Sequence, residues 1–303
     1  MKKAIFGILG VVAVMLVLSA HESANSEEQQ SYDEATDEFA AKYRIAMPPI
    51  PDTIMLCGEI VPQEQWEVRE RLEREVLSNT YWQSNTLLLL KRSGKYFPLI
   101  ERVLREEGVP DDFKYLAVAE SGLMPAVSPA GARGIWQFMK STGTSYGLTI
   151  TSEVDERYHV EKATRAACKY LKKAKAELNS WTLAAAAYNR GLNGIRRDLA
   201  NQKVDNYYDL YLNTETSRYV FRIIAFKLLF ENPNGFGFVL NESQYYTPIT
   251  TKSLEVDTTI MDLAGFAKLN GTIYKELKLL NPWLRDDHLM VRAGEKYVLE
   301  VPN

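Results

Sequence analysis

The chain has 303 residues, of which 46% are hydrophobic and 25% are charged. This composition is that of a globular protein, and the length is enough for one substantial core plus a smaller module. The formal net charge is −3, and residues 39–303 together carry +2, so the sequence predicts no strongly basic face and no nucleic-acid partner.

The first 20 residues combine Lys2 and Lys3 with an uncharged stretch from Ala4 to Leu18. This pattern is typical of a secretory signal peptide, with a retained membrane anchor as the alternative. No cysteine lies near residue 20, which argues against a lipoprotein. We therefore expect an exported protein of the periplasm or cell envelope, which the anchor would tether to the membrane.

Residues 21–59 read as a linker. Residues 21–38 contain seven acids and no base, and they include almost no large apolar group, so this part is expected to be disordered. Pro48, Pro49 and Pro51 then favour extended backbone, because proline fixes φ and restricts the residue before it.

From about residue 60 to 240, apolar residues recur with helical spacing, which predicts a mainly α domain. Breaks are expected at residues 78–79, at Gly94 and at residues 108–110, where glycine, proline or small polar residues interrupt the pattern. Gly122 is expected to end the helix that begins at Pro110. The clearest later helices cover residues 160–178, 180–189 and 213–232.

Residues 245–303 have a different pattern. Strand-like residues 245–252 precede two short helical stretches, at 259–270 and 272–281, and residues 295–302 read as a final strand. The order βααβ predicts a small α+β module, and the whole chain is therefore expected to be mainly α with this module at its C-terminus.

Metal and nucleophile sites find no support in the sequence. The histidines His21, His159 and His288 are scattered, and no Cys/His cluster has ligand spacing. Cys57 and Cys168 do not form a disulfide framework, and Cys168 reads as a small core thiol. We predict neither a metal nor a cofactor.

Glu120 is the most unusual residue of the helical domain. It follows Phe113, Leu116 and Ala117 at the spacing of one helical face, so a carboxyl group stands on a face that should point inward. Burial and the negative end of the helix dipole both raise the pKa of such a group. A carboxyl that stays protonated near neutral pH can protonate a leaving group in glycoside cleavage. The alternative is a structural pair with a buried arginine.

Three motifs then carry a family resemblance. "AESGLMPAVSPAGARGIWQF", from Ala119, resembles the catalytic segment of the soluble lytic transglycosylase-like domain, and "AAAAYNRG", from Ala184, resembles its Ala-Tyr-Asn-x-Gly motif. "TETSRYV", from Thr214, resembles the Glu-Thr-x-x-Tyr-Val motif of the membrane-bound lytic murein transglycosylase D branch. The resemblance covers about residues 60–235 and implies a goose-lysozyme-like α fold. Residues 245–303 resemble a degenerate LysM module, with "YKELKLLNP" as the better-matched part.

The resemblance implies roles for particular residues. Glu120 matches the catalytic acid. Trp136 and Arg190 depart from the family pattern, in which methionine and alanine are common. Alternatives from the residue types are a core position for Trp136, Phe138 or Met139, and a structural ion pair of Glu215 with a helix arginine. Gly131 and Gly134 are expected to shape the loop rather than to touch ligand. The residues matched to substrate binding are Ser128, Gly134, Gln137, Met139, Tyr188, Asn189, Glu215 and Tyr219.

The expected activity is that of a lytic murein transglycosylase, a lyase acting on the glycan strands of peptidoglycan. It would cleave the β-1,4 bond from N-acetylmuramic acid to N-acetylglucosamine and leave a 1,6-anhydro end. The alternatives are a lysozyme-type muramidase and a peptidoglycan-binding protein without catalysis. We also expect a chain that ends near Phe238 to fold and to cleave glycan, with weaker retention on sacculi. The sequence does not identify protein partners.

Overall fold

The computed structural model describes residues 29–30, 33–34 and 45–303. The predicted export signal and most of the predicted disordered segment lie outside the described residues. Residues Pro48–Asn303 form one compact unit. Within the described part of the chain, no helix has both the length and the apolar character needed to cross a membrane.

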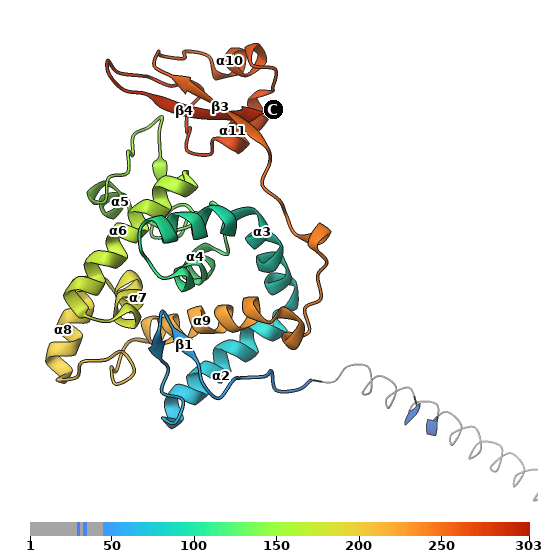
Figure 1. Ribbon diagram of the computed structural model, residues 1–303, viewed down its shortest axis with the longest axis vertical. Coiled ribbons are helices and arrows are strands. Elements are labelled where there is room, and N and C mark those ends of the chain that lie inside the picture. The colour runs from blue at the N-terminus through green and yellow to red at the C-terminus, as the bar shows by residue number, and fades with distance from the viewer. Residues whose placement is uncertain (1–28, 31–32, 35–44) are drawn as a thin grey trace, which may run out of the picture. The chain divides into compact units, whose positions relative to one another are not determined.

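This unit is mainly helical and has a small two-stranded sheet near its C-terminus, which confirms the predicted fold class (Figure 1). Its helices are α2 (Trp66–Tyr81), α3 (Gln83–Glu106), α4 (Lys114–Ser121), α5 (Lys140–Ser145), α6 (Val160–Leu178), α7 (Trp181–Arg190), α8 (Leu192–Gln202), α9 (Thr214–Glu231), α10 (Leu263–Leu269) and α11 (Tyr274–Leu280).

The prediction of a helix break at Gly94 is wrong, because α3 continues through it. Glycine stands inside this helix because a remote segment approaches it closely. A Cβ atom on Gly94 would lie 2.7 Å from the backbone oxygen of Tyr246, whose N–H donates to the carbonyl of Lys91 over 2.9 Å. Glycine at position 94 therefore makes room for the chain that leads to the C-terminal module. The break predicted at residues 78–79 falls instead at Trp82, between α2 and α3.

Helix α4 ends where the sequence predicts. Gly122 follows Ser121 with φ +61°, a left-handed conformation that glycine adopts at little cost, and its N–H donates to the carbonyl of Val118. The helix packs between α3 and α9 (Figure 1). Its apolar residues Tyr115, Leu116, Ala117 and Val118 are buried, so the chain leaves the core just after Glu120.

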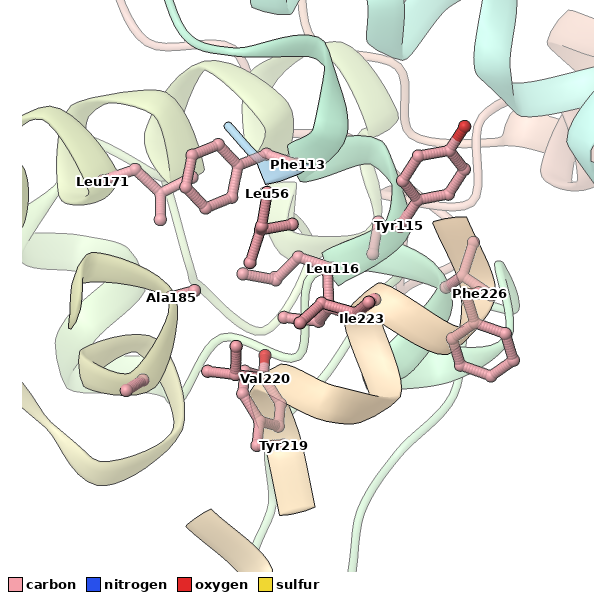
Figure 2. Close-up of a cluster of buried hydrophobic side chains, with 14 of the residues drawn as sticks. Leu56, Phe113, Tyr115, Leu116, Leu171, Ala185, Tyr219, Val220, Ile223 and Phe226 are labelled. Atoms are coloured by element: carbon pink, nitrogen blue, oxygen red, sulfur yellow. The ribbon is translucent and has the colours of Figure 1, made fainter. Parts of the chain in front are cut away.

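A short hairpin contributes to the same core. Strands β1 (Met55–Leu56) and β2 (Glu59–Ile60) pair antiparallel, and the side chains of Ile54, Leu56 and Val61 are almost fully buried. Figure 2 shows Leu56 meeting Leu116 of α4 and Ile223 of α9 in this cluster. The stretch before residue 60, which the sequence assigns to the linker, thus ends inside the core of the helical domain.

The C-terminal module has its own small core. Strand β3 (Thr251–Val256) pairs antiparallel with β4 (Tyr297–Pro302), and α10 and α11 lie between them in the chain, in the predicted order βααβ. The first strand begins at residue 251, six residues later than predicted. Val154 and Tyr158 of the helical domain are buried in the module's core cluster.

A backbone connection fixes this contact between module and domain. Val154 pairs with Leu284 in an antiparallel bridge, and the Asp155 N–H donates to the Trp283 carbonyl over 2.9 Å. The Arg285 N–H donates to the carbonyl of Glu153 over 2.6 Å. The segment 151–158, which we call the docking segment, is therefore shared by both parts of the unit.

Candidate active site in the helical domain

A cleft of about 580 Å³ opens along the helical domain. One side, which we call the helical wall, comes from α2, α3, α4 and α9. The other side comes from residues 126–138, which we call the cleft loop. Of the predicted site residues, Glu120, Ser128 and Gln137 line the cleft. The remaining lining residues are Glu75, Ser78, Asn79, Trp82, Asn85, Leu89, Arg92, Val118, Ala119, Ser121, Gly122, Met124, Ala126, Val127, Arg218, Arg222 and Phe226.

The Glu120 carboxyl group is partly buried at the end of α4 and lines this cleft. Its oxygen Oε1 accepts a short hydrogen bond from the Tyr219 hydroxyl of α9. Two contacts fix the end of α4 around it: the Arg92 guanidinium donates to the carbonyl of Gly122 over 3.2 Å, and the Ser121 hydroxyl donates to the carbonyl of Ile135 over 2.9 Å. The carboxyl group therefore has a fixed position.

The surroundings of Glu120 favour the protonated acid. Burial raises the pKa of its carboxyl to about 7, although the Tyr219 hydroxyl and the Arg222 charge lower it in part; the Glu215 charge raises it further. Burial, together with the Glu120 charge, also raises the pKa of Tyr219 well above its ordinary value. Tyr219 therefore stays a donor, and Glu120 can exchange a proton near neutral pH.

Tyr219 itself is only 2% exposed. Its ring lies in the core beside Val220 and Ile223, as Figure 2 shows. A direct contact with substrate, which the resemblance implies, is disfavoured by this burial. The geometry gives Tyr219 a different role, because it holds one oxygen of Glu120 and leaves the other, Oε2, for proton transfer.

A buried ion-pair cluster adjoins Glu120, and the sequence analysis did not identify it. Glu75 of α2 has a side chain that is 2% exposed; Arg218 Nε lies 2.5 Å from its Oε1, and Arg222 Nε lies 3.6 Å from its Oε2. Arg222 thus pairs with Glu75, and among the described residues no arginine forms an ion pair with Glu120, although the Arg222 charge lies near enough to lower its pKa. A signal was present in the sequence, because Glu75 stands on the buried face of Leu72 and Val76, as Glu120 does on its own face.

Hydrogen bonds to backbone groups determine the shape of the cleft loop. Ser128 exchanges two bonds with Ala132: the Ser128 N–H donates to the Ala132 carbonyl over 2.9 Å, and the Ala132 N–H donates to the Ser128 hydroxyl over 3.0 Å. The Gln137 amide donates to the carbonyls of Ala126 and Gly134 over 3.1 and 2.7 Å. These polar side chains line the cleft and also brace the loop.

Gly134 lets the cleft loop pack closely against the docking segment. It is buried with φ +79°, and a Cβ atom there would lie 1.8 Å from the carbonyl oxygen of Arg157. The Arg157 guanidinium donates to the carbonyls of Phe138 and Gly131 over 3.2 and 3.3 Å and pairs with Asp155 over 2.7 Å. Gly134 therefore serves close packing, and its burial disfavours the direct glycan contact that the resemblance implies.

Tyr188 connects the loop to the core. Its hydroxyl donates to the carbonyl of Trp136 over 2.8 Å, and its ring packs on Trp136 and Phe138. Trp136 is fully buried and donates its indole N–H to Thr164 over 2.8 Å. The core position, which the sequence left as an alternative for Trp136, is confirmed.

The other predicted binding residues lie outside the set that lines this cleft. Asn189 donates to Glu215 over 3.2 Å and accepts from the Thr216 hydroxyl over 2.8 Å, so α7 and α9 are joined there. Glu215 is thus bonded to an amide, and no ion pair with an arginine is found for it among the described residues. Met139 is 43% exposed, so it is not a core residue.

Asp286, Asp287 and His288 form the one group in the described residues whose ligand atoms lie within 4.8 Å and could hold a metal. These residues belong to the C-terminal module and do not line the cleft. Cys57 and Cys168 are both free thiols, and Cys168 is buried, as predicted.

Family models match a segment of the helical domain and the C-terminal module. The family model of the transglycosylase SLT domain matches residues 98–210, and that of the soluble lytic transglycosylase C-terminal LysM-like domain matches residues 252–303. Membrane-bound lytic murein transglycosylase D of Escherichia coli K12 and the protein of the same name from E. coli O6:H1 are each 27% identical over 242 residues. The match covers 78% of this chain and 52% of each relative, so the chain spans about half the length of these curated relatives. The chain contains a transglycosylase SLT domain followed by a soluble lytic transglycosylase C-terminal LysM-like domain.

Proposed function

We propose that this protein is a lytic transglycosylase that cleaves peptidoglycan glycan strands with Glu120 as its acid and base. The observation that carries the proposal is the Glu120 carboxyl itself, which lies in a cleft, is held by Tyr219 and has a pKa raised to about 7. The matches to the SLT domain and to two murein transglycosylases support the reaction class. The bond cleaved is the β-1,4 bond from N-acetylmuramic acid to N-acetylglucosamine.

The first step is protonation of the leaving group. Protonated Glu120 donates its proton to the glycosidic oxygen as the bond from C1 of muramic acid to that oxygen breaks. The muramic N-acetyl group stabilises the positive charge that develops at C1. The Tyr219 hydroxyl and the Arg222 charge, which lower the pKa of Glu120, then stabilise the carboxylate that remains.

In the second step, a new bond forms within the muramic acid residue. The Glu120 carboxylate removes the proton of the C6 hydroxyl while O6 forms a bond to C1. This restores the protonated acid, consumes no water and leaves a 1,6-anhydromuramoyl end. One acid suffices for this sequence, whereas glycoside hydrolysis commonly uses two carboxyl groups.

The other carboxylate that lines the cleft is poorly suited to act as a second catalytic group. Glu75 is bound to Arg218 and lies close to Arg222, so both of its oxygens face cations. Its side chain is only 2% exposed and both oxygens are engaged by arginines, so it is not free to approach the sugar C1 or an attacking water. This arrangement favours the anhydro product over hydrolysis.

Product analysis tests the proposal. Sacculi digested with the full-length protein should yield muropeptides with 1,6-anhydro ends, and digestion with Glu120→Gln should yield none above background. Reducing muramic ends would show that water attacks, and the protein would then be a muramidase. Retention on sacculi without any cleavage would make it a peptidoglycan-binding protein.

A location in the cell envelope fits this substrate. The relatives are named as membrane-bound proteins, and the N-terminal sequence predicts export. Fractionation of the full-length protein should place it in the periplasm or membrane fraction, and recovery from the cytosol alone would contradict the location.

A further inference from the structure

The helical wall of the cleft contains more positive charge than a neutral sugar requires. Arg92 of α3 and Arg218 and Arg222 of α9 line the cleft, and the lining residues include two carboxyl groups, Glu75 and Glu120. Near neutral pH one of these two carboxyls exchanges a proton. The wall therefore has an excess of one to two positive charges.

The three guanidinium groups are held in place and remain accessible. Arg218 contacts Glu75 through Nε, and Nε is also the atom of Arg222 nearest to Glu75. The two arginine side chains are 29% and 30% exposed, whereas the Glu75 side chain is 2% exposed. Because Glu75 is buried beneath Arg218 and Arg222, its ion pairs hold the two arginine side chains in place. Their terminal amino groups can therefore donate to a ligand in the cleft.

The opposite wall lacks such charge. The cleft-lining residues of the loop are Ala126, Val127, Ser128 and Gln137, and hydroxyl and amide groups suit neutral sugar rings. A planar guanidinium instead matches a carboxylate, which it binds through paired hydrogen bonds. The two walls thus differ in the chemistry that they can recognise.

We propose that Arg92, Arg218 and Arg222 bind carboxylates on the 3-O-lactyl arm of muramic acid, so that the protein selects acidic glycan over neutral glycan. This inference rests on the proposed function, because it assumes that the cleft holds a muramic acid residue. The carboxylate has two sources. In strands without peptides it is the lactyl group itself, and in intact strands it belongs to the peptide stem.

Binding can be measured without cleavage on the full-length Glu120→Gln protein. Three probes separate the possibilities: N-acetylglucosamine oligomers, which are neutral; strands freed of peptides by an amidase; and strands that keep their peptides. We expect at least one acidic probe to bind more tightly than the neutral oligomer. Added salt should reduce this difference, because it screens charge–charge attraction.

Arginine substitutions in the Glu120→Gln background locate the effect. Arg222→Gln should weaken binding of the acidic probe by about 10- to 100-fold, the usual value of a charge-assisted hydrogen bond, with less than about a threefold change for the neutral oligomer. Arg92→Gln should act in the same direction and leaves the Glu75 pairs intact, so it covers the case in which Arg222→Gln does not fold. Arg102→Gln, on the same helix but in an exposed pair with Glu106, is the matched control.

The outcomes separate this inference from the proposed function. Loss of binding only for peptide-bearing strands assigns the arginines to the stem, and loss for both acidic probes assigns them to the lactyl carboxylate. Equal affinity for the neutral and acidic probes, or arginine variants that weaken all probes alike, would overturn the inference even if wild-type digests contain anhydro ends. Absence of anhydro ends would overturn the proposed function, whereas the binding preference of the variants would still be measurable.

Discussion

The two walls of the cleft are built in different ways. Side-chain contacts among α2, α4 and α9 hold the helical wall, through the buried Glu75 pairs and the bond from Tyr219 to Glu120. Hydrogen bonds from side chains to backbone carbonyls hold the loop wall, and its shape depends on Arg157 of the docking segment. The helical wall therefore fixes a reactive group, whereas the shape of the loop wall depends on a part of the chain that packs against the C-terminal module.

Loss of the acid on the helical wall should have the largest effect. Glu120→Gln keeps the size of the side chain and removes the transferable proton, so turnover should fall by about 10²–10⁴, the usual contribution of a positioned acid or base. Binding of glycan should persist, as measured by co-sedimentation with sacculi. Glu106→Gln, on the exposed face of α3, is the matched control. If Glu120→Gln has a turnover close to that of the wild type, Glu120 has only a structural role.

Removal of the module tests how far the loop wall depends on it. A chain that ends near Phe238 would expose Val154 and Tyr158, which are 2% and 5% exposed. Losing this burial should cost about 3 kcal/mol or more of unfolding free energy, and cleavage of soluble glycan strands should fall with it. The sequence suggested instead that such a chain would keep its fold and its activity.

Thermal unfolding and activity on soluble strands measure this effect. The full-length variant Leu269→Ser, at a position 88% exposed, should behave as wild type and serves as the control. A truncated chain with unchanged melting temperature and activity would show that the module is only an accessory to the catalytic domain.

A smaller change tests the packing beneath the loop. Gly134→Ala would force a Cβ atom against the Arg157 carbonyl in a left-handed conformation, whereas Gly131→Ala has φ +87° and open space around it. Both variants incur about 1–2 kcal/mol of backbone strain, so the difference between them isolates the clash. Gly134→Ala should unfold at a lower temperature and raise KM more than Gly131→Ala. Equal effects would show that Arg157 moves away at little cost.

The pH profile should show the smallest and most specific effect. The general acid must be protonated, so kcat/KM should fall as pH rises above about 7, the pKa of Glu120. The Tyr219 hydrogen bond lowers that pKa, so Tyr219→Phe should move the alkaline limb to higher pH. Tyr146→Phe, at a tyrosine outside the cleft lining, should leave the limb in place.

The same pKa links pH to stability. Because folding raises the pKa of Glu120 above its ordinary value, its contribution to stability is present below the ordinary pKa and is lost as pH rises through about 7. Glu120→Gln should therefore flatten the dependence of melting temperature on pH in this window. An unchanged slope would contradict the raised pKa.

The sequence by itself determined features that depend on neighbours along the chain. Helical spacing placed Glu120 on the inward face of α4, glycine at position 122 ended that helix, and the order of elements in residues 245–303 was predicted correctly. Spacing and local conformational preference act over a few residues, so they can be read directly from the sequence.

Only the tertiary structure decided which distant residues meet. Arg218 and Glu75 are 143 positions apart, and the space left by the missing side chain of Gly94 is filled by a segment about 150 residues later. The C-terminal module likewise completes its core with Val154 and Tyr158. Each of these contacts depends on how whole helices and strands pack. The local pattern of apolar and polar residues does not indicate which distant residue will be in contact.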